Sequence, residues 1–182
     1  MKNHKHLILI FFLLLQFPLT LLSQSKLHYI DKPSVAKPYK SVKAVVLLAD
    51  HDEVIGKFTD EFVNNVASAF EAKGIEVQKN LIYSDIDPDI TVQRLDSIIQ
   101  NYNPEGIILL SVIGSGIMKA QTIGNLRPCL VFDFQYSYRG DGTDSYVHMF
   151  MTHISIDSQK LDLAEPFASE ELLKKMVKKK VL

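Results

Sequence analysis

Two almost uninterrupted apolar runs, residues 43–49 and 107–113, limit what this chain can fold into. Strands of this kind are usually covered on both faces, as they are in a parallel β-sheet. The segments between the two runs predict a helix, a strand and a second helix in that order. A strand–helix–strand–helix–strand series predicts parallel strands with helices on the sheet. The predicted fold class is therefore α/β, with a three-layer βαβαβ core.

The residues between the runs also predict where these elements begin and end. The first helix is expected to be capped by Thr59 and to stop at Gly74, where a left-handed residue is needed. A strand is expected over 75–83, and the second helix should end before Pro104. The apolar side chains of the second helix form one stripe, made of Leu95, Ile98, Ile99 and Tyr102.

The pattern changes in the second half of the chain, where apolar and polar residues alternate over 130–139. Such a period of two predicts a half-buried strand, and residues 144–157 predict its partner. A tight turn at Asp141–Gly142 would join them as an antiparallel hairpin. The register expected from that turn is Arg139 opposite Asp144, Tyr136 opposite Val147, Phe134 opposite Met149, and Phe132 opposite Met151.

The chain is expected to close with a helix from Ser169 to about Lys180. Its glutamates stand near the positive end of the helix dipole and its lysines near the negative end. The spacing predicts Glu170–Lys174 and Glu171–Lys175 ion pairs. The lysine-rich end is interpreted as a solvated helix terminus, although a surface for an anionic partner stays open as an alternative.

The first 25 residues have the parts of a secretory signal peptide. Lys2 and Lys5 precede an apolar stretch, and small residues at Ser23 and Ser25 predict cleavage after Ser25. The alternative is a retained membrane anchor, which would need about 20 apolar residues. The expected organisation is a signal peptide over 1–25, a linker over 26–42 and a single α/β domain over 43–182. We therefore expect an extracytoplasmic protein, periplasmic or secreted, with no stable membrane insertion after cleavage.

Composition narrows the class of partner further. The 20 basic and 21 acidic residues give no net positive charge, so no nucleic acid is expected to bind. Cys129 is the only cysteine, so the chain cannot form an internal disulfide. Because Cys129 begins an apolar strand, a buried and inert thiol is predicted rather than a nucleophile.

Three polar segments follow the predicted parallel strands, at 50–53, 84–89 and 114–116. The carboxyl ends of parallel strands share one edge of the sheet, which is the usual ligand crevice. Carboxylates gathered there could hold Mg²⁺ or Ca²⁺, which prefer several oxygen ligands. The alternative is that they only cap helices and form turns. The candidate metal ligands are Asp50, Asp52, Asp85 and Asp87. No other cofactor is expected.

His148 and His153 are the remaining candidates for a metal pair. They stand an odd number of positions apart on one predicted strand, so their side chains are expected on opposite faces. We therefore expect them to take part in packing rather than in a shared site.

The region 45–116 resembles the receiver domains of response regulators. The run that ends in Asp50-His51-Asp52 looks like their first strand and acidic pair. Ser111, however, stands where the family has its phospho-acceptor aspartate. The resemblance therefore implies a doubly wound fold without phosphotransfer.

A second resemblance is to haloacid dehalogenase-like phosphohydrolases. It implies a metal-assisted enzyme, because phosphoryl transfer needs a nucleophile and positive charge around the phosphate. The eight positions between Ser111 and Lys119 leave little room for the usual intervening elements. The implied roles are Asp50 and Asp52 as nucleophile and general acid, Ser111 as phosphate ligand, Lys119 as charge stabiliser, and Asp141 and Asp144 as Mg²⁺ ligands.

In layout, residues 43–182 are similar to small envelope domains of the TolB amino-terminal and penicillin-binding-protein-activator type. That resemblance implies a protein that binds other envelope proteins and is not an enzyme. The sequence also contains no complete catalytic set. The predicted function is an exported, non-catalytic binding or assembly module with an envelope protein as partner. The alternatives are the phosphohydrolase-like enzyme and a small-ligand sensor that uses the crevice.

Overall fold

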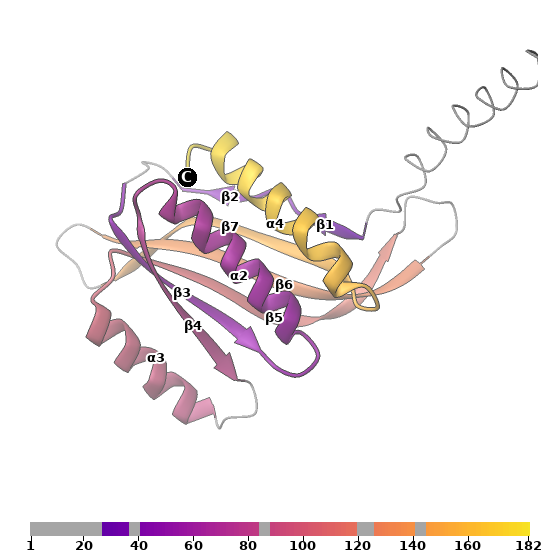
Figure 1. Ribbon diagram of the computed structural model, residues 1–182, viewed down its shortest axis with the longest axis horizontal. Helices are drawn as coiled ribbons and strands as arrows, with labels where there is room; N and C mark the ends of the chain where they lie inside the picture. The colour runs from indigo at the N-terminus through magenta and orange to yellow at the C-terminus, as the bar shows by residue number, and fades with distance from the viewer. Residues whose placement is uncertain (1–26, 37–40, 84–87, 120–125, 141–144) are drawn as a thin grey trace, which may run out of the picture.

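The computed structural model describes residues 27–36, 41–83, 88–119, 126–140 and 145–182 (Figure 1). The predicted signal peptide lies outside this part of the chain. Four predicted metal ligands lie outside it too: Asp85, Asp87, Asp141 and Asp144. Within the described residues, no helix is long and apolar enough to cross a membrane.

In the described residues, seven strands form one mixed sheet, and three helices pack on it. The strands lie in the order β1-β7-β6-β5-β3-β4, and β2 also pairs with β7. β3 is parallel to β4 and β5, and every other pair is antiparallel. The strands are β1 (His28–Ile30), β2 (Ser34–Val35), β3 (Ala44–His51), β4 (Glu76–Tyr83), β5 (Gly106–Lys119), β6 (Leu126–Arg139) and β7 (Tyr146–Asp157). The helices are α2 (Gly56–Glu71), α3 (Pro88–Tyr102) and α4 (Leu161–Lys178). The α/β class, the parallel unit, the hairpin and the closing helix are thereby confirmed.

The main core lies between the sheet and the helices α2 and α4, which lie side by side on one face (Figure 1). The apolar stripe of α2 supplies Phe58, Phe62 and Phe70, each at most 1% exposed. These rings pack on the aromatic side chains of β6: Phe58 on Phe132 and Phe70 on Tyr136. Burying aromatic side chains contributes much of the stability of a single core, so this layer holds the domain together.

A smaller core lies on the opposite face, under α3. Leu95 and Ile98 of α3 pack against Val46 and Leu48 of β3 and against Ile82 of β4. This agrees with the predicted stripe for both helix residues. Tyr102 departs from it, because its side chain is 51% exposed at the end of the helix.

The first helix begins four residues earlier than predicted, with Ile55 rather than Thr59 at its N-cap. Thr59 is not its cap: it lies inside α2 and is fully buried. The preceding turn is closed by Asp52, whose Oδ1 accepts hydrogen bonds from the backbone N–H groups of Val54 and Ile55 at 2.7 and 2.8 Å. The end of the helix is as predicted, because Gly74 has a φ of 76°.

The closing helix also begins earlier than predicted, at Leu161 rather than Ser169. Pro166 is the sixth residue of this helix, so its missing N–H removes one backbone hydrogen bond of the second turn. The added turns bury Ala164 and Ala168 against the main core. The predicted pairs are present, with Glu170–Lys174 at 2.6 Å and Glu171–Lys175 at 3.4 Å.

β5 is twice as long as the strand predicted over 107–113. It continues through Gly114-Ser115-Gly116 to Lys119, antiparallel to β6, with a register shift between Val112 and Gly114. The expectation of a third crevice loop at 114–116 is therefore wrong. Gly114 and Gly116 belong to the hydrogen-bonded ladder of β5 and β6. These glycines therefore indicate the register shift in that ladder rather than a turn.

The hairpin exists, but its predicted register is wrong. Phe134 pairs with Thr152 rather than Met149, and Phe132 pairs with Ile154 rather than Met151. The connection is longer than two residues, because the Gly140 N–H donates to the Ser145 carbonyl. A second register shift follows at Met149, the extra residue of a β-bulge. Both effects keep apolar side chains of β7 in the main core.

The segment predicted as a linker contributes to the sheet. Its residues form β1 and β2, which extend the sheet along β7. Ile30 is 2% exposed and belongs to the main core. His28 is also buried, with its Nε2 atom 2.9 Å from Glu171 Oε2 of α4.

Glu165 of α4 provides a test of the contact between α2 and α4. Its side chain is 2% exposed and accepts a hydrogen bond from Asn65 Nδ2 at 3.0 Å. Burial raises the pKa of Glu165, while hydrogen bonds from Asn65 and Ser169 partly oppose this effect. A raised folded-state pKa means that the protonated acid stabilises the fold. This contribution is full below the ordinary pKa and is lost as pH rises through the raised pKa.

We therefore expect the stability of Glu165→Gln relative to the native protein to increase as pH rises from 4.5 to 8. Only the native protein loses the contribution of the protonated acid over this range. Urea denaturation at the two pH values would measure the gain. Glu170→Gln is the matched control, because Glu170 lies on the same helix with its side chain 61% exposed. The same change in both variants would contradict a specific role for the buried carboxyl group.

Candidate functional site

One half of the sheet has a face that no described helix covers. On the side of α3, the helix contacts β3, β4 and β5, which leaves β6, β7 and β1 uncovered there (Figure 1). We call this uncovered surface the open face. Its side chains alternate with the core residues along the same strands, so their positions follow directly from the register.

A strip of polar side chains crosses the open face from strand to strand. Ser111 of β5 pairs with Asp133 of β6, and Asp133 pairs with His153 of β7. Directly opposite residues in a ladder project to the same face, so these three side chains are neighbours. Asp31 extends the strip beyond β7, since its N–H donates to the His153 carbonyl at 3.0 Å. Asp50 extends it at the other end, where its Oδ2 accepts from the Val112 N–H at 2.8 Å.

The imidazole of His153 lies between two carboxylates of the strip. Its Nδ1 is 3.6 Å from Asp31 Oδ2, and its Nε2 is 3.8 Å from Asp133 Oδ1. Asp133 is 9% exposed and also accepts a hydrogen bond from Gln135 at Oδ2. Its Oδ1 makes no hydrogen bond within the described part of the chain. A buried carboxylate oxygen without a partner is stabilised by a hydrogen-bond donor. The strip can therefore accept a hydrogen bond from a molecule bound on the open face.

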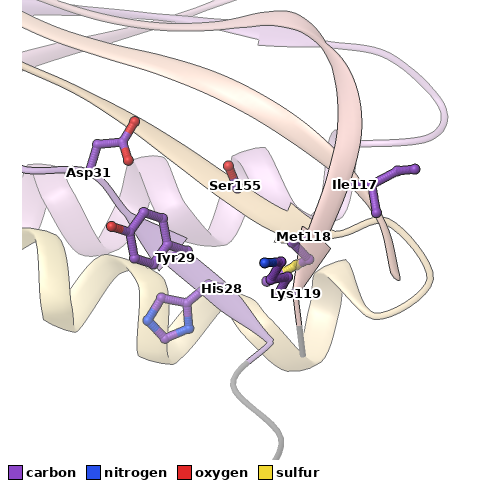
Figure 2. A pocket seen from close by; sticks show the side chains of 7 residues that line it. All are labelled: His28, Tyr29, Asp31, Ile117, Met118, Lys119 and Ser155. Carbon is purple, nitrogen blue, oxygen red and sulfur yellow. The ribbon is translucent and has the colours of Figure 1, made fainter. Parts of the chain in front are cut away.

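A cleft of about 570 Å³ adjoins this strip (Figure 2). Its side chains come from three parts of the chain that are far apart in the sequence: the segment of β1, the end of β5 and the end of β7. Tyr29 and Ser155 are directly opposite in the ladder of β1 and β7, and Asp31 belongs to both the cleft and the strip. The lining residues are His28, Tyr29, Asp31, Ile117, Met118, Lys119 and Ser155.

The cleft has the size and the mixed lining that a binding site requires. Its volume is within the range of small-molecule sites, and it combines apolar walls with a few polar groups. Asp31 and Lys119 carry opposite charges, and Ile117 is 70% exposed. Such a surface can bind a partner that offers both apolar area and polar ends.

The predicted acidic residues lie at the far end of the strip. Asp50 is at the end of β3, and burial raises the pKa of its carboxyl group. The Val112 N–H opposes that shift, while the charge of Asp52 adds to it. Asp52 uses its Oδ1 to close the turn before α2. This is the turn and cap role that the sequence left open as an alternative.

Of the four metal ligands predicted in the crevice, the structure describes only Asp50 and Asp52. No group of three His, Cys, Asp or Glu side chains within them is placed to hold a metal ion. Asp85 and Asp87 lie outside the described residues. Whether Asp50 and Asp52 take part in a Mg²⁺ or Ca²⁺ site stays a prediction.

Ser111 and Lys119, which the phosphohydrolase resemblance places in one site, lie far apart on β5. Ser111 is close to Asp50, because the next residue, Val112, donates to the Asp50 carboxylate. Lys119 ends the same strand, and at ~3.3 Å per residue it is roughly 25 Å farther along. The structure therefore joins Lys119 to the cleft and Ser111 to the polar strip.

The two histidines of β7 lie on the same face, contrary to the expectation from their spacing. His148 pairs with Ser137 and His153 pairs with Asp133, and both partners project to the open face. The bulge at Met149 adds one residue between them and so reverses the parity. Ser137 Oγ is 3.0 Å from His148 Nδ1. Ser137 is only 7% exposed, so its hydroxyl group is poorly accessible as a nucleophile.

Cys129 is buried at 3% exposure, as predicted, and burial raises the pKa of its thiol. A thiol with a raised pKa is a poor nucleophile at neutral pH. The cleft residues Tyr29 and Asp31 were missed by sequence reasoning because they lie in the expected linker. The only signal was the Tyr29-Ile30 pair in a short segment, which is too brief to show a period.

No family model matches the chain, and no curated protein matches it. Solved structures do match. The PelC dodecamer from Paraburkholderia phytofirmans matches in two crystal forms, with 13% and 14% identity and TM-scores of 0.46 and 0.44. The matches cover 82% and 81% of this chain and 97% and 96% of the PelC chain.

Lipoprotein GNA1162 from Neisseria meningitidis matches with 10% identity and a TM-score of 0.32, over 72% of this chain and 99% of its own. A neuraminyllactose-binding hemagglutinin homolog from Helicobacter pylori matches with 10% identity and a TM-score of 0.34, over 77% and 90%. The structural neighbours are thus PelC, a lipoprotein and a hemagglutinin homolog, all at low identity. Neither the TolB-type nor the receiver resemblance is confirmed by them.

Proposed function

We propose that the protein is an exported, non-catalytic binding module of the cell envelope that engages its partner through the open face. The observation that carries the proposal is the cleft beside Tyr29 and Lys119, on a sheet half that no described helix covers. The amino-terminal sequence supports export, because it has the basic, apolar and small-residue parts of a signal peptide. Export would give a mature chain that begins at Lys26.

The polar strip supports binding rather than hydrolysis. Its side chains are held by one another, as Gln135 donates to Asp133 and His153 lies between Asp133 and Asp31. A nucleophile in the cleft would need a base within hydrogen-bond reach. Within the described residues, the hydroxyl group of Ser155 makes no hydrogen bond to a base. The open face therefore offers recognition chemistry, with fixed acceptors beside an apolar wall.

A photocrosslinking side chain at Ile117 would test this surface in the native envelope. Ile117 lines the cleft and is 70% exposed, so a reactive group there reaches a bound partner. We expect a defined adduct from this position, and we expect Ser155→Arg to abolish it by filling the cleft. Val54 is the matched control, because it is 74% exposed and does not line the cleft.

The same adduct from Val54 and Ile117 would contradict the proposal, since it would report general exposure. So would an Ile117 adduct that survives Ser155→Arg in a protein with unchanged circular dichroism. Amino-terminal sequencing of the exported form tests localisation separately, with Lys26 as the expected first residue.

A small-ligand sensor is the second candidate, favoured by the volume of the cleft alone. A small molecule in the cleft would raise the thermal midpoint of the native protein but not of Ser155→Arg. A ligand at 100 times its dissociation constant would add about 2.7 kcal/mol to the free energy of unfolding. A shift without any protein adduct would favour the sensor over the assembly module.

A further inference from the structure

A second concavity lies on the other side of β1, between this strand and the end of α4. Its volume is about 400 Å³, and Tyr29 lines both this concavity and the cleft. We call it the lysine concavity, because four of its eight lining residues are lysines. The lining residues are Tyr29, Ile30, Lys32, Pro33, Glu171, Lys175, Lys178 and Lys179.

The charge of this concavity is only partly balanced. Lys175 is committed to the fold, since its Nζ donates to the carbonyl groups of Ile30 and Asp31 at 2.6 and 3.3 Å and contacts Glu171. Within the described part of the chain, Lys32, Lys178 and Lys179 have no ion-pair partner. Three ammonium groups therefore face one concavity that contains a single carboxylate, which is already paired.

The helix dipole does not account for this arrangement. Cations near the carboxyl end of a helix are favourable, which explains why Lys178 and Lys179 stand at the end of α4. Lys32 belongs to a different segment, after β1, more than 140 positions earlier in the sequence. Like charges brought together from distant segments repel each other, so the arrangement implies a counter-charge.

We propose that the lysine concavity binds a multiply charged oxyanion of the phosphate class. Lysine ammonium groups act as mobile point charges with three donors each, which suits a group with several acceptor oxygens. A phosphate-type group offers more oxygens and more charge than a carboxylate, and the concavity has room for one. The source is either a soluble phosphate compound or the headgroup of an anionic lipid.

Binding to two kinds of probe tests the proposal on the purified exported protein. Pyrophosphate and inorganic phosphate, measured by calorimetry at low salt, represent the soluble source. Co-sedimentation with phosphatidylglycerol vesicles, against phosphatidylcholine vesicles, represents the lipid source. We expect binding to at least one anionic probe, and weaker binding as salt screens the charges. Binding to vesicles alone assigns a lipid headgroup, and binding to soluble phosphates assigns a free anion.

The test variant replaces Lys32, Lys178 and Lys179 with glutamine. It should bind about tenfold or more weakly, because each ammonium near an anionic surface contributes to affinity. The matched control replaces Lys43, Lys73 and Lys160 with glutamine. These are exposed lysines outside the concavity, so the net charge changes by the same amount as in the test variant. Circular dichroism and thermal denaturation should show both variants folded.

Two results would overturn the proposal: no binding of any anionic probe, or an equal loss of affinity in the control variant. The crosslink from Ile117 is expected to persist in the lysine variant, because the two cavities lie on different sides of β1. Failure of one proposal is therefore distinguishable from failure of the other.

Discussion

Replacing Phe70 with alanine is expected to lower the free energy of unfolding by about 3–5 kcal/mol, which is the usual range for a large aromatic side chain in a core. Phe70 is fully buried in α2, and its ring meets Tyr136 edge to face at a centroid distance of 5.3 Å. The substitution removes this contact and leaves a cavity between α2 and β6. Urea denaturation followed by circular dichroism would measure the loss.

Phe167→Ala is the matched control for this prediction. Phe167 is the same residue type on α4, but its side chain is 49% exposed, so a loss of only about 0.5 kcal/mol is expected. Phe70→Leu gives a milder test, because a domain with a total stability of about 5–15 kcal/mol could fail to fold with the alanine variant. Similar losses at positions 70 and 167 would contradict the placement of Phe70 in the core.

The parallel half of the fold could be predicted because its strands and helices carry strong local signals. Residues 44–49 are apolar throughout and lie in β3, and Gly74 marks the end of the first helix with a left-handed conformation. The start of that helix was less predictable. Asp52, rather than Thr59, closes the turn before it through local contacts with the N–H groups two and three residues later. Because Asp and Thr can both take this role, the residue types alone did not decide between the two positions.

The hairpin could be predicted as an element but not in its register. Alternation fixes which residues of one strand share a face, but it does not fix the length of the connecting loop. The loop is longer than Asp141–Gly142 alone, and the bulge at Met149 shifts the pairing again. The same bulge brings His148 and His153 to one face, which a strict period of two excludes.

The candidate site was the least predictable part of the molecule. The phosphohydrolase resemblance implies Lys119 as a charge stabiliser beside Asp50 and Ser111, whereas the length of β5 carries it to the cleft. Tyr29 reaches the cleft through a strand of three residues, which is too short to show alternation. A site built where distant segments meet leaves no local pattern, so only the sheet topology reveals it.

The ion pair of Arg127 and Asp157 is the second place where a substitution is expected to lower the free energy of unfolding strongly. Arg127 Nη1 lies 2.8 Å from Asp157 Oδ2, and the Asp157 side chain is 2% exposed. Asp157 also accepts a hydrogen bond from the Gln159 N–H at Oδ1, just before α4. The pair therefore fixes the end of β7 to β6 and to the start of the closing helix.

We expect Arg127→Met to destabilise the protein by about 3 kcal/mol, because it leaves a buried carboxylate without a counter-ion. Asp157→Asn should cost less, since Arg127 is 24% exposed and can turn towards water. Adding Asp157→Asn to Arg127→Met should recover part of the loss, and a double-mutant cycle in urea would measure that coupling.

The pair of Lys57 and Asp162 is a control with the same separation and a different environment. Its atoms are also 2.8 Å apart, but its side chains are 65% and 52% exposed. Solvent screens such a pair, so Lys57→Met should leave the free energy of unfolding nearly unchanged. If burial rather than distance decides the strength of an ion pair, Arg127→Met must lower the free energy of unfolding clearly more than Lys57→Met does. Equal losses would mean that Asp157 is hydrated in solution and that the end of β7 is less enclosed than the structure shows.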